Sequence, residues 1–128
     1  MSGRIDIARA YLKAIEANAS TDAFLTPDVE QIEFPNRLNP NGGRSNLAEM
    51  KARGDRGRDM VRRQAYAVQR AYEQGDTVIL EVDWSATFNV PVGGLQPGEA
   101  MKAHFAVFLE FDGKRIRRQR NYDCFEPF

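Results

Sequence analysis

Two polar residues near the end of the chain, Asn121 and Asp123, have the types and the spacing that proton transfer needs. Residues two apart on a β-strand point to the same face, so this amide and this carboxyl would meet one cavity. An aspartate beside an apolar wall is desolvated, which raises its pKa and lets it act as acid or base near neutral pH. The alternative is a surface carboxylate paired with Arg117 or Arg120, where an ion pair adds little stability. Relative exposure decides between these interpretations.

His104 is the only histidine, and its ordinary pKa of about 6.5 suits acid–base chemistry. It alternates with Phe105 and Val107, which places it on the outer side of a sheet and favours a surface or interface role. Cys124 has no histidine partner that the sequence reveals, and we interpret it as structural. One histidine and scattered carboxylates form no recognisable metal-ligand spacing, so we expect neither a metal nor a cofactor.

Glu81 and Asp83 form a second pair of carboxylates two residues apart. They could act as an acid and a base, with Asp83 contacting a ligand. The alternative is a polar outer face, because Val82 and Trp84 belong to the apolar face of the same strand.

Three elements must position these groups. A hairpin over 100–125 is indicated by Asp112-Gly113 between two strand-like runs, because this dipeptide favours a tight turn. The stretch Thr77–Phe88 alternates strictly between apolar and polar residues and predicts a half-buried strand. The stretch Ile5–Ala19 has apolar residues at helical spacing and predicts a helix that covers the sheet.

The remaining elements are shorter. We predict a second short helix from Ser20 or Thr21 to Leu25, ended by Pro27, and then a strand over 29–34. The loop 35–44 contains Asn36, Arg37, Asn39 and Asn41, which either orient a polar ligand group or serve only turn chemistry. A third helix begins after Ser45 or Asn46, with Glu49 completing a capping box. Gly54 and Gly57 predict a break in it or a mobile flap, and a strand over 64–72 and a loop over 89–99 follow.

Helices that precede a run of antiparallel strands predict an α+β fold, with the helices packed on one face of a curved sheet. The length of 128 residues predicts one domain over 1–128. Eighteen basic residues balance eighteen acidic ones, so there is no electrostatic argument for a nucleic-acid partner. Without a signal peptide or a long apolar run, we expect no membrane segment and a cytoplasmic protein.

Several motifs in this order resemble the nuclear transport factor 2-like superfamily, and within it the SnoaL-like and ketosteroid isomerase-like proteins. They are the stretches YLKAIEAN at 11–18, FLTPDV at 24–29, EFP at 33–35, FDGKRI at 111–116 and RNYD at 120–123. The resemblance implies a cystatin-like cone, in which a bent sheet wraps the first helix and leaves an apolar pocket. It also implies a homodimer that packs through the outer face of the sheet. The residues Ala106 and Phe108 support this, because they make the outer face too apolar to leave in water.

Some functional residues of the superfamily have a match in this chain, and others do not. Ketosteroid isomerase-like members use a tyrosine on the first helix to bind the substrate oxygen, and Tyr11 matches it. Their base precedes the proline after the first strand, where this chain has Phe34, and their protonated aspartate falls near Val107. We therefore expect no ketosteroid isomerase activity, because the base alone supplies about 10²–10⁴-fold.

The epoxide hydrolase-like members of the same superfamily use an Asp/Arg/Asp set. Here Asp83 matches one aspartate, whereas Glu81 stands at the arginine position and Asn121 at the second aspartate. An amide cannot take up a proton at neutral pH, so this reaction also lacks its groups.

Two main hypotheses follow, since a fold alone does not determine function. The first is an isomerase, cyclase, dehydratase or hydrolase that transfers protons on a small apolar, oxygenated ring compound. The second is a binding or accessory homodimer with the same pocket and no chemistry, and a purely structural dimerisation module is a third. We place the pocket between the first helix, the loop 34–41, the third helix and the last strand. Its predicted catalytic residues are Tyr11, Asn121 and Asp123, and its predicted ligand contacts are Phe34, Asn36, Asp83 and Trp84.

Overall fold

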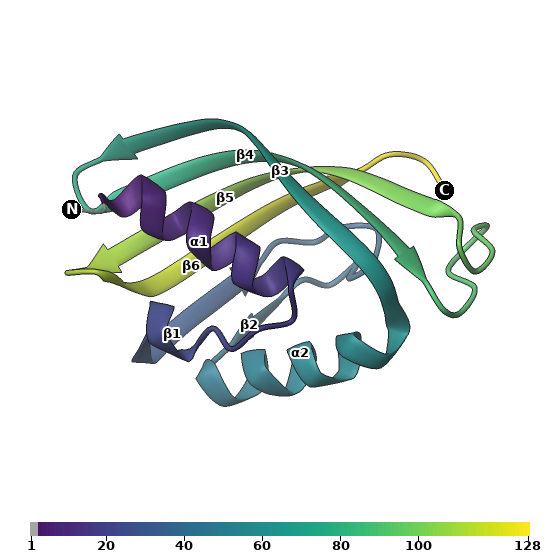
Figure 1. Cartoon of the computed structure of the whole chain (residues 1–128), viewed down its shortest axis with the longest axis horizontal. Coiled ribbons are helices and arrows are strands. Elements are labelled where there is room, and N and C mark those ends of the chain that lie inside the picture. Colours follow the sequence, from purple (N-terminus) through teal and green to yellow (C-terminus); the bar gives the residue numbers. More distant parts are fainter. Residues whose placement is uncertain (1–2) are drawn as a thin grey trace.

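The computed structural model describes residues 3–128 as two α-helices, one 3-10 turn and a curved six-stranded sheet (Figure 1). In chain order the elements are α1 (Arg4–Glu16), η1 (Asp22–Phe24), β1 (Leu25–Glu33), β2 (Gly43–Ser45), α2 (Leu47–Met60), β3 (Val61–Gln74), β4 (Thr77–Phe88), β5 (Ala100–Asp112) and β6 (Arg115–Phe125). The strand order is β2-β1-β6-β5-β4-β3. Among the strands of residues 3–128, only β1 and β6 pair in parallel, and the predicted α+β fold is confirmed.

The core lies between α1 and the concave face of the sheet. Figure 1 shows α1 crossing in front of β4, β5 and β6. Five of the apolar residues that alternate along β4 are buried, as the period of two predicted: Val78, Leu80, Val82, Trp84 and Ala86. The sixth, Phe88 at the end of the strand, is half-buried. Val78, Leu80 and Val82 share one buried cluster with Ala8, Tyr11 and Leu12 of α1, so the two amphipathic elements bury each other's apolar faces. Trp84 and Ala86 belong to a second cluster with Met101 and Ala103 of β5.

The helix α1 ends at Glu16, before the predicted Ala19. Asn18 has a φ of 56°, and the N–H of Ala19 donates back to the carbonyl of Ala14. This is a left-handed helix end, a conformation that Gly adopts most readily and Asn next most readily.

The strand β1 begins at Leu25, four positions before the prediction, because Pro27 lies inside the strand and does not end a helix. The parallel ladder with β6 shifts register between Leu25 and Glu30. Proline is tolerated at such an irregularity because its missing N–H is not needed for a ladder bond.

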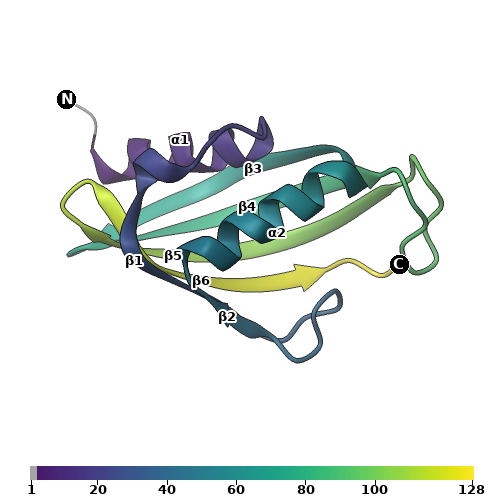
Figure 2. The same ribbon diagram turned by 90° about the horizontal axis from the view of Figure 1, so that it is seen from below.

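The helix α2 connects the two edge strands, β2 and β3, and so spans the open side of the curved sheet (Figure 2). Asn46 caps it with the predicted capping box, in which Glu49 N–H donates to Asn46 Oδ1 and Asn46 N–H donates to Glu49 Oε1. The predicted break at Gly54 and Gly57 is wrong, because the helix runs through both glycines. The cap and the anchored ends outweigh the propensity cost of about 1 kcal/mol for each glycine.

Replacing Gly54 or Gly57 by Ala is expected to stabilise the fold. Neither position has a positive φ, and an added Cβ would meet nothing within 4 Å. Each change should add about 0.4–1 kcal/mol, which corresponds to a rise in Tm of about 2–5 °C. Thermal unfolding measures it. Gly75→Ala is the matched control: its Cβ also meets nothing, but its φ is +58°, so this variant should lose stability. A lower Tm for both helix variants would contradict the expectation.

Candidate functional site

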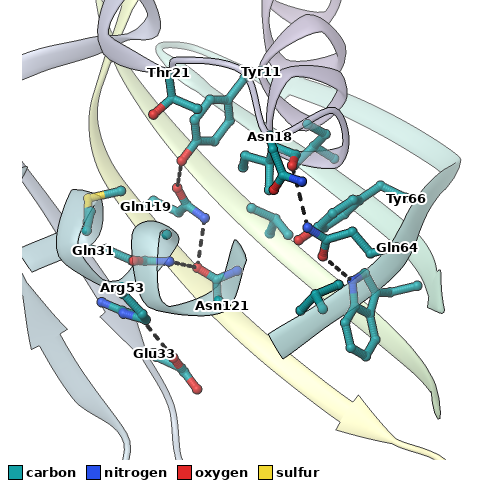
Figure 3. A pocket seen from close by; sticks show the side chains of 18 of the residues that line it. Tyr11, Asn18, Thr21, Gln31, Glu33, Arg53, Gln64, Tyr66, Gln119 and Asn121 are labelled. Atoms are coloured by element: carbon teal, nitrogen blue, oxygen red, sulfur yellow. Dashed lines mark hydrogen bonds and ion pairs between the residues drawn. The ribbon is translucent and has the colours of Figure 1, made fainter. Parts of the chain in front are cut away.

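A cavity of about 610 Å³ lies between α1, α2 and the concave face of the sheet. Figure 3 shows that its side chains come from the helices and from strands at both ends of the sheet. One wall is polar and the other is aromatic, and the two walls have different origins in the sequence.

The polar wall is built by the parallel pair β1 and β6. Gln119, Asn121 and Asp123 alternate along β6 and all line the cavity. The register places Gln31 beside Gln119, and Glu33 beside Asn121. Because paired residues point to the same face, five polar side chains converge on one patch of the cavity.

Three of these side chains and Tyr11 form one chain of hydrogen bonds (Figure 3). The Tyr11 hydroxyl donates to Gln119 Oε1 at 2.6 Å, and Gln119 Nε2 donates to Asn121 Oδ1 at 2.9 Å. Gln31 Nε2 donates to the same Asn121 oxygen at 3.1 Å. Tyr11 is only 2% exposed, and its burial raises the pKa of the hydroxyl far above its ordinary value. Tyr11 therefore remains protonated and acts as a donor.

Asp123 faces the same cavity and is half-buried. Its Oδ1 is buried and has no hydrogen-bond partner among the described residues. Burial raises the pKa of this carboxyl to about 7, and the negative charge of Glu33 adds to the shift. The surface pairing with Arg117 and Arg120 is absent from the described structure, because both guanidinium groups bind Glu110. Near neutral pH, Asp123 can thus either take up or release a proton.

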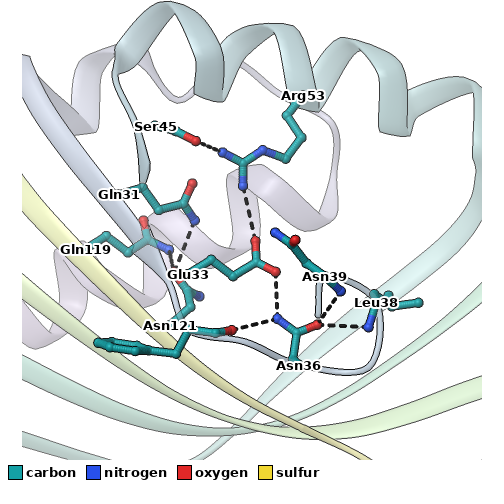
Figure 4. A network of polar contacts seen from close by, with 10 residues as sticks. Gln31, Glu33, Asn36, Leu38, Asn39, Ser45, Arg53, Gln119 and Asn121 are labelled. Carbon is teal, nitrogen blue, oxygen red and sulfur yellow. Dashed lines mark hydrogen bonds and ion pairs between the residues drawn. The ribbon is translucent and has the colours of Figure 1, made fainter. Parts of the chain in front are cut away.

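Glu33 is the second carboxylate of the polar wall, and its charge is compensated (Figure 4). Arg53 of α2 donates to Glu33 Oε1 at 3.3 Å and also binds the hydroxyl of Ser45. Asn36 Nδ2 donates to Glu33 Oε2 at 2.7 Å. Asp123 lacks such partners, which separates a structural carboxylate from one that is free to react.

The aromatic wall consists of side chains from β3, β4, β5 and β6. Trp84 stacks on Phe105 with ring centroids 5.2 Å apart, and Phe125 meets Trp84 edge-on at 6.0 Å. Tyr66 completes the wall at 6.3 Å from Phe105. Trp84 Nε1 donates to Gln64 Oε1 at 3.2 Å, which holds the indole in place. The aromatic wall offers a flat apolar surface opposite the polar wall.

The structure brings five of the predicted site residues to the cavity: Tyr11, Asn36, Trp84, Asn121 and Asp123. Asn36 is fully used by its own loop, because its oxygen accepts from the N–H groups of Leu38 and Asn39 while its nitrogen donates to Glu33 and to the carbonyl of Phe34. Of the two interpretations of this residue, the geometry supports turn chemistry.

Two predicted ligand contacts lie on the outer face of the sheet. Phe34 stacks on Tyr122 with centroids 4.4 Å apart, and Asp83 lies 2.8 Å from His104 Nδ1. The cause is the strand alternation: Glu33 and Trp84 point inward, so their neighbours must point outward. Neither Phe34 nor Asp83 lines the cavity, and both are removed from the candidate ligand contacts.

Sequence reasoning does not single out Gln31, Glu33 or Gln119. The period of two could have led from Asn121 back to Gln119. Nothing local, however, indicates that β1 would lie beside β6 with its polar face inward.

In residues 3–128, no three His, Cys, Asp or Glu side chains are grouped so that they could hold a metal ion. Neither helix in this part of the chain combines the length and the apolar composition that crossing a bilayer demands.

No family model matches the chain, and no curated protein sequence matches it either. Solved structures do match over most of its length. An NTF2-like protein from Burkholderia pseudomallei has a TM-score of 0.77 and 18% identity over 98% of this chain and 92% of that one. A SnoaL-like polyketide cyclase from Agrobacterium tumefaciens has a TM-score of 0.73 and 17% identity over 96% and 92%. A protein from Catenulispora acidiphila with a ketosteroid isomerase-like fold, solved with trimethylamine, has a TM-score of 0.71 and 17% identity over 91% and 84%. At such identities the similarity concerns the fold.

Proposed function

Because the chain has the nuclear transport factor 2-like fold, we propose that it uses its cavity for proton transfer on a small apolar ring compound that carries a carbonyl group. The observation that carries the proposal is Asp123: a carboxyl with a buried, unpartnered oxygen and a pKa of about 7, beside the aromatic wall. A general base works best when its pKa lies near the operating pH.

The chemistry begins at the carbon next to the carbonyl. Asp123 takes a proton from this carbon, and the electron pair of the C–H bond moves to form an enolate. Asn121, about 7 Å along the strand, donates a hydrogen bond to the enolate oxygen. Asp123 then returns the proton. If a C=C bond lies next to the deprotonated carbon, the enolate extends over it, and delivery of the proton to the far carbon shifts the double bond and completes an isomerisation. In a cyclisation, the enolate carbon first attacks a second carbonyl of the same molecule, and the proton neutralises the resulting alkoxide.

The cyclisation variant gains support from the SnoaL-like polyketide cyclase that shares the fold. The cavity has the size of an ordinary small-molecule site, which spans about 300–1,000 Å³, and its flat wall of Trp84 and Phe105 suits a planar ring system.

A binding protein without chemistry is the second candidate. It is favoured by one contact, the hydrogen bond from Tyr11 to Gln119, because this bond occupies the donor that the resemblance assigned to a substrate oxygen. In this case Asp123 would only bind the ligand.

Indanone separates the two candidates, since it is a compact bicyclic ketone with exchangeable protons next to its carbonyl. Trp84 is the only tryptophan and lines the cavity, so quenching of its fluorescence reports binding. An enzyme should bind indanone and accelerate the exchange of these protons in deuterium oxide, which NMR measures. Binding without accelerated exchange would support the binding protein, and the absence of both would reject the proposed ligand class.

We also propose that the protein forms a homodimer through the outer face of its sheet. Phe34, Tyr122 and Phe108 form a continuous aromatic cluster there, in which Tyr122 stacks on Phe34 and meets Phe108 edge-on, and Tyr122 is 40% exposed. His104 lies on the same face between Asp83 and Glu126, and its hydrogen bonds to these carboxylates raise its pKa. The aromatic part of this face is the apolar patch that would be covered in the dimer, and the charged groups around it would form the rim.

Sedimentation at micromolar concentration should show a dimer. A crystal structure of this dimer should bury about 800 Å² on each partner. Tyr122→Lys should raise its Kd by at least about tenfold, because a central aromatic residue usually carries much of the binding energy. Val90→Lys is the control, since Val90 is comparably exposed at 39% but lies in the loop between β4 and β5. A wild-type protein that sediments only as a monomer would refute the dimer.

A further inference from the structure

We propose that Tyr11, Gln119 and Gln31 hold the Asn121 side chain in one orientation, with its NH₂ group toward the cavity, so that the site selects ligands presenting an oxygen acceptor over ligands presenting only a donor. Gln119 is then a positioning residue, and Asn121 is the group that touches the ligand. The inference rests on the proposed function only in that the cavity holds a small ring compound.

The direction of the hydrogen bonds begins at Tyr11. Its hydroxyl is buried, and among the described residues it has one hydrogen-bond partner, Gln119. A buried O–H group needs an acceptor, because leaving it unpaired costs free energy. The Tyr11 proton must therefore point to Gln119, and Gln119 must present its oxygen rather than its NH₂ group.

The orientation of the Gln119 amide sets the orientation of the Asn121 amide. With its oxygen directed at Tyr11, Gln119 can offer only its NH₂ group to Asn121, 2.9 Å away. Gln31 offers a second N–H at 3.1 Å. Two donors can be accepted only by an oxygen, so Asn121 must direct Oδ1 at both. Reversing the Asn121 amide would place its NH₂ group against these two N–H groups.

With its oxygen bound to Gln119 and Gln31, Asn121 has only its side-chain nitrogen left to bind a ligand. Nδ2 has no hydrogen-bond partner among the described residues, and Figure 3 shows it on the side away from both dashed bonds. Asn121 lies next to Asp123 on the inward face of β6, at the cavity. A ligand therefore meets a fixed N–H donor beside a carboxyl, an arrangement that suits a carbonyl oxygen with an acidic C–H group near it.

Three probes of nearly equal size test the selectivity. Indanone presents an acceptor, indole presents only a donor, and indene presents neither. Calorimetry gives the three affinities, and dividing by the value for indene cancels general changes in cavity shape. At pH 5 Asp123 is protonated and offers no charged acceptor to the N–H of indole. At this pH wild-type protein should prefer indanone to indole by about three- to tenfold, the ratio that one net hydrogen bond supplies.

Gln119→Leu removes the relay and frees the Asn121 amide to rotate, so this preference should fall to about twofold or less. Tyr11→Phe provides a second variant in case the first does not fold. It removes the group that sets the direction, and the preference should fall in the same way. Gln69→Leu is the matched control, because Gln69 is exposed on β3 and bonds only to the carbonyl of Ala67. Its preference should equal that of the wild type.

The inference is overturned if wild-type protein prefers indole, or if both variants retain the full preference for indanone. If the wild type binds none of the probes, the proposed function and this inference fall together. If the preference and its loss are observed but Asp123 has no effect on proton exchange, the inference stands and only the proposed catalysis fails.

Discussion

Asp123→Asn is expected to lower the rate of proton exchange from indanone by about 10²–10⁴-fold, the usual contribution of a general base. The amide has nearly the same shape as the carboxyl but cannot accept a proton at neutral pH. Binding of indanone, followed by Trp84 fluorescence, should change little, because the aromatic wall and Asn121 are untouched. The loss should therefore appear in kcat rather than in KM.

The pH profile gives a second signature of the same group. A base must be deprotonated, so the wild-type rate should rise with pH, reach half its maximum near the Asp123 pKa of about 7, and then level off. Asp83→Asn is the matched control, the same substitution on the outer face. It should leave the exchange rate unchanged. An Asp123→Asn variant with the wild-type rate would refute the catalytic role of this carboxyl.

Asp123 should also make the folded state less stable as pH rises. Its pKa is raised from 3.8 to about 7 in the folded protein, so between these values the folded state binds more protons than the unfolded state. Stability therefore falls as pH rises through this window and is constant in this respect above and below it. We expect a total of about 2 kcal/mol, since the half-buried carboxyl is partly screened by solvent.

Urea unfolding of wild type and Asp123→Asn between pH 4 and pH 8 measures this linkage. The variant should be more stable than the wild type by about 2 kcal/mol at the upper end and equal to it at the lower end. His104 also has a raised pKa and favours the folded state more at low pH. Its contribution is the same in both proteins and cancels in the difference, because the two groups lie on opposite faces of the sheet. A difference that does not vary with pH would show that Asp123 is not desolvated.

The two predictions with Asp123 are independent of each other. The stability measurement needs no ligand, so it tests the environment of the carboxyl even if indanone is not a substrate. A pH-dependent stability difference without an effect on exchange would identify a buried ionisable group that binds but does not react.

The local pattern of the sequence was sufficient for the elements and for one face of the site. Strict alternation over Thr77–Phe88 predicted both the limits of β4 and its buried face, because a strand with one apolar face has only one way to meet a core. The same rule placed Asn121 and Asp123 together. The NTF2-like fold followed from the order of the elements and from the motifs that resemble this superfamily.

Only the tertiary structure decided what surrounds these residues. The parallel pairing of β1 with β6 joins positions about ninety residues apart, for example Gln31 and Asn121. Nothing in a local pattern specifies such a pairing, because it depends on the competition among all strands for neighbours. The pairing turned Gln31 and Glu33 inward and Phe34 outward. It also gave Asn121 the second of its two donors, Gln31, beside the first, Gln119 of its own strand. A few local spacings therefore determine which reactive side chains share a face of β6. Long-range packing determines the polar neighbours of Asn121 and leaves the Asp123 carboxyl without a partner.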